Sequence, residues 1–334
     1  MENSTSDAGR TVAIVNPRAS SGGAGELWPA IESALGVHFP GLEVRFTEAA
    51  GHASELCRHA LEGGATRILS VGGDGTNNEV LGGFIDDEGD NRFPEAILGI
   101  LAAGTGGDFQ RAMGRVSPRD QVRGLSKAPV RTVDYGVARF VDHEGVQAIR
   151  PFLNMASVGV SGEVVRHVNA SEKRYGPLLT YLEGSLRGIA GHRNQQVEIA
   201  YDDGPARRID LTLCAIGNGQ FFGSGMWICP RAELDDGLLD VVEVAGMSRS
   251  RLVATLAKVF QGRHLRVRGV ETSRARSVEL RPIAARNTVQ LELDGEQPGR
   301  LPARFEIHPG RLRLQIVSGR AKGRPFSTDP IPGD

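Results

Sequence analysis

The sequence predicts an α/β N-terminal domain with a mainly parallel sheet, followed by a C-terminal domain that is a β-rich antiparallel sandwich. Three observations lead to this fold class. The first third of the chain alternates short apolar runs with amphipathic helical segments, and glycine-rich loops follow two of those runs. From about residue 131 the apolar segments lengthen and alternate with polar residues, as antiparallel strands do. The length of 334 residues suits two domains of roughly 150 residues each.

Four strand-and-helix units are expected in the first domain, which we place at 10–130. The apolar runs that indicate strands are 11–15, 42–46, 67–71 and 96–101. Each is followed by apolar residues at helical spacing, in stripes that include Ile31 and Leu35, Ala53 and Leu61, Val80 and Phe84, and Phe109 and Met113. Repetition of strand, loop and helix favours a parallel sheet covered on both faces, with ligands at the carboxyl ends of its strands.

The second domain, at 131–317, is expected to be built mainly from strands. The segments that alternate are 132–140, 152–158, 196–201, 209–216, 238–244, 289–293 and 305–314. Helices are expected near 174–190 and 248–260. The remaining residues, 318–334, are rich in glycine, proline and charge, which predicts a disordered tail.

Composition excludes several classes of function. The formal net charge of −1 argues against a broad nucleic-acid-binding surface. Three cysteines without metal-ligand spacing indicate neither a disulfide framework nor a zinc site. The first residues lack the features of a signal peptide, and no apolar run reaches the roughly 18 residues of a membrane helix. We therefore expect a cytoplasmic protein without a transmembrane segment.

The stretch SVGGDGTNNEVLGGF, at 70–84, raises the question of phosphate binding. Gly72, Gly73 and Gly75 would let the backbone take positive φ and direct several N–H groups at one anion, next to a helix that begins near Thr76. A structural alternative stays open. Thr76 and Glu79 have the spacing of a capping box, so that Glu79 would only cap the helix. Thr105 and Asp108 repeat this spacing at the second glycine loop.

Asp74 is the residue that the capping alternative leaves unexplained, because it places an acid among amides that favour anions. A carboxylate there is reasonable if it binds Mg²⁺ that is itself bound to phosphate. The first loop, 16–25, lacks the glycine and lysine order of a Walker loop, and no dinucleotide-binding glycine fingerprint follows the first strand.

Seven segments together resemble the bacterial diacylglycerol kinase and lipid kinase family, which shares its catalytic domain with the sphingosine and ceramide kinases. They follow the family order over roughly residues 10–317 and are IVNPRASSGGAG (14–25), VGGDGTNNEV (71–80), ILAAGTGGDFQRAMG (100–114), TVDYGVARF (132–140), FLNMASVGVSGEVV (152–165), IGNGQFFGSGMWICPRAELDDGLLDVVEV (216–244) and LELDGE (291–296). The resemblance implies the fold of NAD kinase and diacylglycerol kinase, and an ATP- and Mg²⁺-dependent lipid kinase.

The resemblance also implies a nucleotide site in the first domain. Its ATP-binding residues would be Asn16, Ser20, Ser21, Thr47, Gly72, Gly73, Asp74, Gly75, Thr76, Asn77, Asn78, Thr105 and Asp108. Asp74 would act through Mg²⁺ on the phosphates. The family usually has Asn where this chain has Gly107, so one hydrogen-bonding side chain is missing, and its effect is left open.

Acids in the second half have both a structural and a functional interpretation. The Asp-Asp-Gly and Asp-Gly sequences at 235–237 and 294–295 are ordinary turns. The resemblance adds a structural Mg²⁺ held by the Asp236 carboxylate and the carbonyls of Glu233 and Leu238. It also makes Glu296 the general base, with Asp294 positioning it or sharing the role.

The implied substrate is a lipid hydroxyl, most simply that of diacylglycerol, which would give phosphatidic acid. Phosphatidylglycerol, a sphingoid base or another alcohol stays open, as does a homodimer. The aromatic cluster Phe221, Phe222, Met226 and Trp227 favours a core over a lipid-contacting lip. Arginines around a leucine-rich helix, Arg166, Arg174, Arg187 and Arg193, suit either a solvated face or transient contact with anionic headgroups. NAD kinase, which shares the G-G-D-G-T loop, and a nucleotide-binding regulator without turnover are the alternatives.

Overall fold

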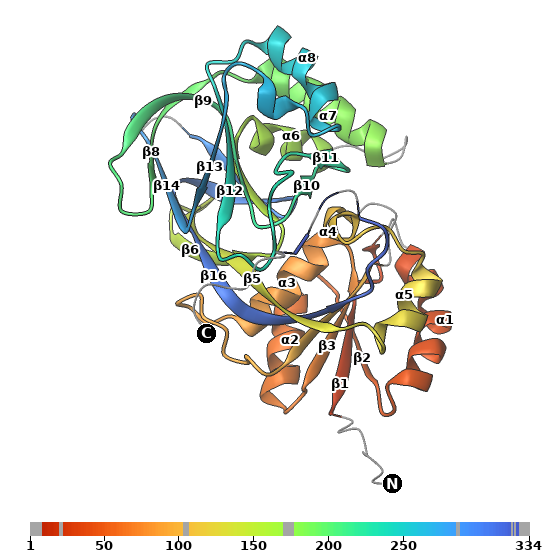
Figure 1. The fold of residues 1–334 in the computed structure, drawn as a ribbon. Helices are drawn as coiled ribbons and strands as arrows, with labels where there is room; N and C mark the ends of the chain where they lie inside the picture. Colours follow the sequence, from red (N-terminus) through yellow and green to blue (C-terminus); the bar gives the residue numbers. More distant parts are fainter. Residues whose placement is uncertain are drawn as a thin grey trace. The chain divides into compact units, whose positions relative to one another are not determined.

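The computed structural model describes residues 9–19, 23–102, 107–169, 177–284, 288–321, 323 and 325–326. The chain forms two compact units (Figure 1). Unit 1 contains Met1–Val133 and Arg311–Ala321, and unit 2 contains Asp134–Gly310 and Lys322–Asp334. Residues 311–317 were assigned to the second domain on the sequence, but they join unit 1 because they pair with its sheet. In the predicted tail, the Gly319 N–H donates to the Met113 carbonyl at 2.9 Å.

Unit 1 has the predicted parallel sheet. Its strands are β1 (Thr11–Val15), β2 (Glu43–Phe46), β3 (Arg67–Gly72) and β4 (Ile97–Ala102), in the order β4-β3-β1-β2. The last residues of β16 (Glu296–Ile316), from Arg313 on, add a fifth parallel strand beside β4. All four predicted strands are therefore confirmed, with bounds that differ by one residue at most.

Helices cover both faces of this sheet (Figure 1). One face carries α1 (Gly23–His38) and α5 (Pro118–Leu125), whose side chains share a core with β3 through Leu35, Val122 and Leu69. The other carries α2 (His52–Glu62) and α3 (Asp74–Phe84), which pack closely enough that a Cβ on Gly83 would lie 2.4 Å from the Cys57 Cβ. The short helix α4 (Asp108–Ala112) follows the second glycine loop. Helix α5 was not predicted.

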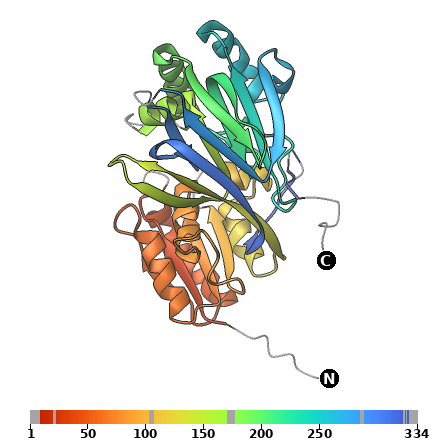
Figure 2. The ribbon, with the colours of Figure 1, turned by 90° about the vertical axis from the view of Figure 1, so that its left-hand side faces the viewer.

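The described strands of unit 2 pair in antiparallel fashion, and Figure 2 shows its long strands side by side. Its strands are β5 (Val130–Asp142), β6 (Gln147–Phe152), β7 (Met155–Gly159), β8 (Gln195–Tyr201), β9 (Arg207–Gly217), β10 (Phe221–Phe222), β11 (Met226–Trp227), β12 (Leu239–Ala245), β13 (Val270–Ala275), β14 (Ser277–Pro282), β15 (Gln290–Leu293) and most of β16. Its helices are α6 (Val160–Asn169), α7 (Pro177–Gly191), α8 (Arg249–Val259) and a 3-10 turn at His264–Arg266. The predicted β-rich antiparallel domain is confirmed; α6, β6, β13 and β14 were missed.

The strands of unit 2 form a sandwich in which long strands pass from one layer to the other. β9 pairs with β7 through its end and with β8 through its start, while β16 pairs with β15 and then with β14. The core between the layers includes Phe305, Leu291 and Ile216. A second core lies between the strands β9 and β12 and the helices α6, α7 and α8. Unit 2 therefore carries an apolar layer on the outer side of its sheet as well.

Candidate functional site

The residues predicted to bind the nucleotide follow neighbouring strands of the unit 1 sheet. The order β4-β3-β1-β2 places the topological switch point between β1 and β3, which is where ligands bind in open α/β sheets. Asn16 follows β1, and its N–H donates to the Val71 carbonyl at 3.0 Å. The Thr47 N–H, after β2, donates to the Val15 carbonyl at 2.9 Å. The strand ends thus bring Asn16, Thr47 and the first glycine loop to one edge.

Helix α3 begins two residues earlier than predicted, at Asp74, and the capping box does not form. Gly73 precedes the helix, and no side chain caps it. The Thr76 hydroxyl instead accepts a hydrogen bond from the Asn16 side chain at 3.1 Å, and the Glu79 carboxylate accepts one from the Ala53 N–H at 3.2 Å. The prediction that Glu79 caps its own helix is therefore wrong, because both side chains find partners in other segments.

The polar residues of the first turn of α3 lie on its inner side. Thr76, Asn77 and Asn78 are buried, and the Ser70 hydroxyl donates to the Asn77 side-chain oxygen at 2.7 Å. Asp74 and its two glycine neighbours are the partly exposed residues of this stretch. A ligand that approaches the loop therefore meets Gly73, Asp74 and Gly75 first.

The glycines do not adopt the positive φ that was expected, since none of Gly72, Gly73 and Gly75 is among the positive-φ residues. Gly72 is required by packing, because a Cβ there would lie 2.4 Å from the Thr76 hydroxyl oxygen. Gly73 is extended, with φ −107°, and a Cβ there would meet nothing within 4 Å. The fold itself thus imposes no requirement for glycine at 73.

Asp74 connects the two glycine loops. One carboxylate oxygen accepts the Asp108 N–H at 2.7 Å and the other accepts the Phe109 N–H at 3.4 Å, both in the first turn of α4. The Asp108 carboxylate in turn pairs with Arg111 at 3.4 Å. A Cβ at Gly107 would lie 3.6 Å from an Asp74 oxygen, an ordinary contact. Ser20, Ser21 and Thr105 lie outside the described residues.

In unit 2, Asp294 is held by three backbone amides. Its carboxylate accepts the N–H groups of Leu153 at 2.8 Å, Asn154 at 3.0 Å and Met155 at 2.8 Å, and its own N–H donates to the Met155 carbonyl at 2.9 Å. Asp294 is buried and has φ +46°. The carboxylate satisfies the turn before β7, so its oxygens are committed to the backbone.

Glu296 differs from Asp294 in exposure and partner. It begins β16, its side chain is 37% exposed, and it pairs with Arg150 at 2.8 Å.

A third acid of this region, Glu292, was not predicted. It is buried, accepts the Gly295 N–H at 2.6 Å and bonds to the Ser157 hydroxyl. An acid between two leucines of a predicted strand is the signal that would have found it. Of the three carboxylates, Glu296 is the one that solvent reaches.

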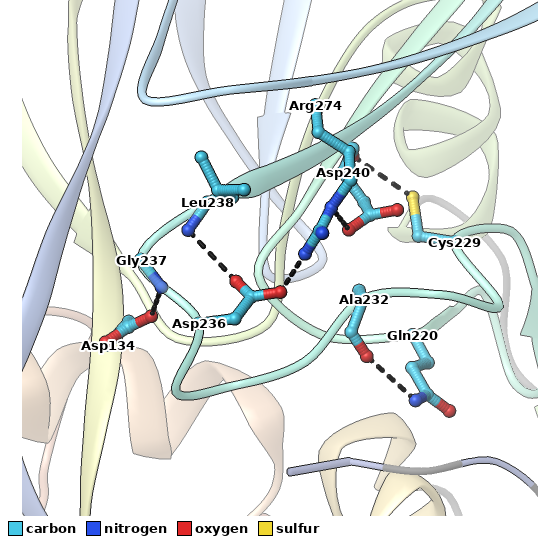
Figure 3. A network of polar contacts seen from close by, with 9 residues as sticks. All are labelled: Asp134, Gln220, Cys229, Ala232, Asp236, Gly237, Leu238, Asp240 and Arg274. Atoms are coloured by element: carbon cyan, nitrogen blue, oxygen red, sulfur yellow. Dashed lines mark hydrogen bonds and ion pairs between the residues drawn. The ribbon is translucent and has the colours of Figure 1, made fainter. Parts of the chain in front are cut away.

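Of the predicted metal ligands, Asp236 and Leu238 lie in the network of Figure 3. One oxygen of Asp236 accepts the Leu238 N–H at 3.0 Å, and the other holds the guanidinium of Arg274. Asp134 accepts the N–H groups of Gly237 and Gly310, each at 2.7 Å, and burial raises the pKa of Asp134 to about 6. Within the described ranges, no group of three or more His, Cys, Asp or Glu side chains could hold a metal ion. Asp236 is thus the acid of this loop whose carboxylate is held by a protein cation, and the role of the loop in metal binding stays a prediction.

Unit 2 also contains an apolar cavity beneath its helices. The cavity has a volume of about 70 Å³. Among the residues that the structure describes, the lining has no charged side chain and comes mainly from the three helices and the facing strands: Val160, Val164, Tyr181, Ile189, Leu213, Phe222, Met226, Ile228, Val244, Met247, Leu252, Leu256, Val259 and Val270, with Ser161, Ser185, Thr255 and His264. Phe222 and Met226 of the aromatic cluster are buried, as the sequence predicted, and both also line this cavity.

Comparisons with known proteins agree with the fold. The model of the diacylglycerol kinase catalytic domain matches residues 10–138, and that of the YegS C-terminal NAD kinase beta sandwich-like domain matches residues 154–316. The Chromohalobacter salexigens protein named "Probable lipid kinase YegS-like" is 31% identical over 84% of this chain and 85% of its own length. The Mycobacterium tuberculosis protein named "Diacylglycerol kinase" is 27% identical over 92% of this chain and 95% of its own length.

A solved structure supports the fold independently. The crystal structure of a diacylglycerol kinase from Bacillus anthracis superposes with a TM-score of 0.66 at 21% identity, covering 92% of this chain and 97% of that one. The two domains and their order define a kinase of the diacylglycerol kinase and NAD kinase fold. The chain belongs to the YegS-like family of lipid kinases, as the sequence motifs had indicated.

Proposed function

We propose that this lipid kinase uses Mg²⁺ and ATP to phosphorylate the hydroxyl of diacylglycerol, giving phosphatidic acid. The observation that carries the choice of lipid is the cavity in unit 2, whose described lining residues are apolar or uncharged. Such a cavity suits the acyl chains of an uncharged lipid, because burying a charged group without a partner is costly. NAD kinase activity, the other enzymatic alternative, leaves this apolar cavity without a use.

The nucleotide would bind at the edge where Asn16, Thr47 and the first glycine loop lie. Successive amides at the start of α3, together with the helix dipole, favour the phosphates. When bound, Mg²⁺ would neutralise charge on the transferred phosphoryl group, and Asp74 is the carboxylate at this edge that would hold it. The Asp108 and Phe109 N–H groups, which donate to the Asp74 carboxylate, would fix its orientation at this edge.

Glu296 would act as the general base. The lipid oxygen forms the new bond to the γ-phosphorus, the bond to the β-phosphate oxygen breaks, ADP leaves, and the hydroxyl proton goes to the Glu296 carboxylate. Asp294 would position this turn, since three backbone amides already occupy its oxygens. Of the two acids, the more exposed Glu296 is therefore our candidate for the base.

The first prediction tests whether Gly73 serves phosphate binding while Gly72 serves the fold. Gly73→Val is expected to weaken ATP binding at least about tenfold, or about 1.4 kcal/mol, because the new side chain fills space that phosphate would occupy. Its Tm should stay near that of the wild type, since a Cβ there meets nothing and β-branched residues favour the extended conformation. Calorimetric titration with ATP and a thermal melt measure the two effects.

Gly72→Ala is the matched control, because its Cβ would collide with the Thr76 hydroxyl. This variant should lose thermal stability. If Gly73→Val binds ATP as the wild type does, the phosphates bind elsewhere and this part of the proposal is wrong.

Membrane contact would use the outer side of α7. Leu179, Leu182 and Leu186 are 56%, 37% and 43% exposed and recur at helical spacing, while Tyr181, Ser185 and Ile189 of the same helix line the cavity. An apolar stripe of this kind fits the boundary between headgroups and acyl chains. Of the arginines predicted to meet anionic headgroups, Arg187 pairs with Glu183 at 2.8 Å. No helix in the described ranges is long and apolar enough to cross a membrane.

The second prediction tests that stripe. Replacing all three leucines with serine is expected to weaken binding to vesicles of phosphatidylcholine and phosphatidylglycerol at least about tenfold, since three apolar side chains no longer enter the membrane. Turnover of a water-soluble short-chain diacylglycerol should be unchanged. Val37→Ser, at the 77% exposed Val37 of unit 1, is the control and should bind vesicles normally. Equal sedimentation of triple variant and wild type with vesicles would exclude α7 as the contact.

The substrate is tested with a panel. Purified protein with ATP and Mg²⁺ is offered diacylglycerol, phosphatidylglycerol, sphingosine and NAD separately, and ADP release is measured. The proposal predicts the largest kcat/KM for diacylglycerol. A larger value for any other acceptor overturns the choice of diacylglycerol, and ATP binding without ADP release for any of them would favour the regulator.

A further inference from the structure

The loop that the family resemblance assigned to a metal has a cation beside it, supplied by the neighbouring strand β13. We propose that Arg274 takes the place of a divalent ion in unit 2 and holds the Asp236 loop at the start of β12, so that this chain needs no metal there. Arg274 is a positioning residue: it acts on the loop at 229–240 and not on the substrate.

Strand register places the guanidinium at this loop. β12 and β13 are antiparallel with Asp240 opposite Arg274, and directly opposed residues have side chains on the same face. The Arg274 Nε donates to an Asp240 oxygen at 3.2 Å, and a terminal nitrogen reaches Asp236 (Figure 3). Because guanidinium presents several donors in a fixed plane, one side chain bridges two carboxylates four residues apart.

The charge balance of the loop agrees with this assignment. Asp236 and Asp240 are each 11% exposed at the side chain, so their charges need a partner nearby. Arg274 is 43% exposed and contacts both. A divalent ion at Asp236 would have to displace the guanidinium or lie beside it, and two cations on one carboxylate repel each other.

Other contacts hold the rest of the loop without any ion. The Gly237 N–H is bound by Asp134, Gly237 has φ +72°, and the Gln220 side chain donates to the Ala232 carbonyl at 2.8 Å. The Leu238 N–H points to Asp236. Protein groups therefore hold this turn through its Gly237 and Leu238 N–H groups and the Ala232 carbonyl.

The test compares thermal unfolding and tryptic cleavage of the full chain, without nucleotide, in excess EDTA and in excess MgCl₂. It is run at about pH 8, above the pKa of about 7 to which burial raises Asp240, so that this carboxylate is ionised. The wild type is expected to show the same Tm in both solutions and no early cleavage after the exposed Arg231. A higher wild-type Tm in MgCl₂ would overturn the proposal without the use of any variant.

Arg274→Gln is expected to lower Tm in EDTA by about 3 °C and to accelerate cleavage after Arg231 severalfold, because two carboxylates lose their cation. MgCl₂ should restore both readouts in this variant, and Arg274→Lys should retain part of the stability. Arg281→Gln is the control, since Arg281 is exposed and pairs with the neighbouring Glu279 of the same strand. If Arg274→Gln behaves as Arg281→Gln does, Arg274 does not hold the loop and the inference is wrong.

Discussion

Glu296→Gln is expected to lower kcat for lipid phosphorylation by a factor of about 10² to 10⁴, the usual contribution of a general base. The amide keeps the size and shape of the carboxylate but cannot take the hydroxyl proton. ATP affinity should be unchanged, because Glu296 would act on the lipid hydroxyl and not on the nucleotide. Stability should change by less than about 1 kcal/mol, since the lost ion pair with Arg150 is well exposed.

The measurement is steady-state kinetics with diacylglycerol in mixed micelles, together with a thermal melt. Glu306→Gln is the matched control, because Glu306 lies on the same strand, β16, and pairs with Arg304 at 2.9 Å. That variant should keep the wild-type kcat. A Glu296→Gln enzyme that retains most of its turnover would place the base at another residue.

Asp294→Ala is expected to give the largest loss of stability, at least about 3 kcal/mol in the free energy of unfolding. Three amides, those of residues 153–155, would lose their acceptor, and each unsatisfied buried donor costs about 1–3 kcal/mol. The backbone adds to this loss, because φ +46° is easier for Asp or Asn than for Ala. Asp294→Asn should therefore lose less than Asp294→Ala.

Urea unfolding followed by circular dichroism measures these differences. Asp142→Ala is the control: Asp142 also accepts two backbone N–H groups, from Glu144 and Val146, but in an exposed turn where water can replace it. Its loss should stay near 1 kcal/mol, the usual net value of a hydrogen bond. Wild-type stability combined with abolished turnover in Asp294→Ala would mean that Asp294 acts in the chemistry.

Together these two variants separate the roles of two acids that are two residues apart. Glu296→Gln is expected to change the rate and not the stability, whereas Asp294→Ala is expected to change the stability first. The Asp-Gly sequence between strands is an ordinary turn, as the sequence alone indicated. The structure adds that Asp294 binds the neighbouring segment at 153–155.

Much of unit 1 could be predicted because its information is local. Apolar runs and helical spacing identify each strand and helix, and parallel pairing then brings the loops after β1 and β3 to one edge. The contact between Asn16 and Thr76, 60 residues apart in the chain, follows from that rule. The capping box failed because a local pattern competed with tertiary partners: Thr76 and Glu79 bind Asn16 and Ala53.

The acids of unit 2 could not be placed from the sequence, because their partners are distant in the chain. Asp236 meets Arg274 only through the register of β12 and β13, and Asp294 meets residues 153–155 only through the pairing of β15 and β7. Spacing along the chain contains no information on such registers. Asp74 shows the same limit, since its bonds to the first turn of α4 depend on how β3 and β4 align.

The central claim is that this chain transfers the γ-phosphoryl group of ATP to diacylglycerol, with Glu296 as the base. The most direct measurement incubates wild type and Glu296→Gln with γ-phosphate-labelled ATP and diacylglycerol micelles, with Mg²⁺ or with EDTA, and counts label in extracted lipid. The account predicts labelled phosphatidic acid from the wild type with Mg²⁺, and a loss of label of at least about 10² in the variant and in EDTA. Absence of label in lipid from the wild type, or equal labelling by both proteins, would contradict it.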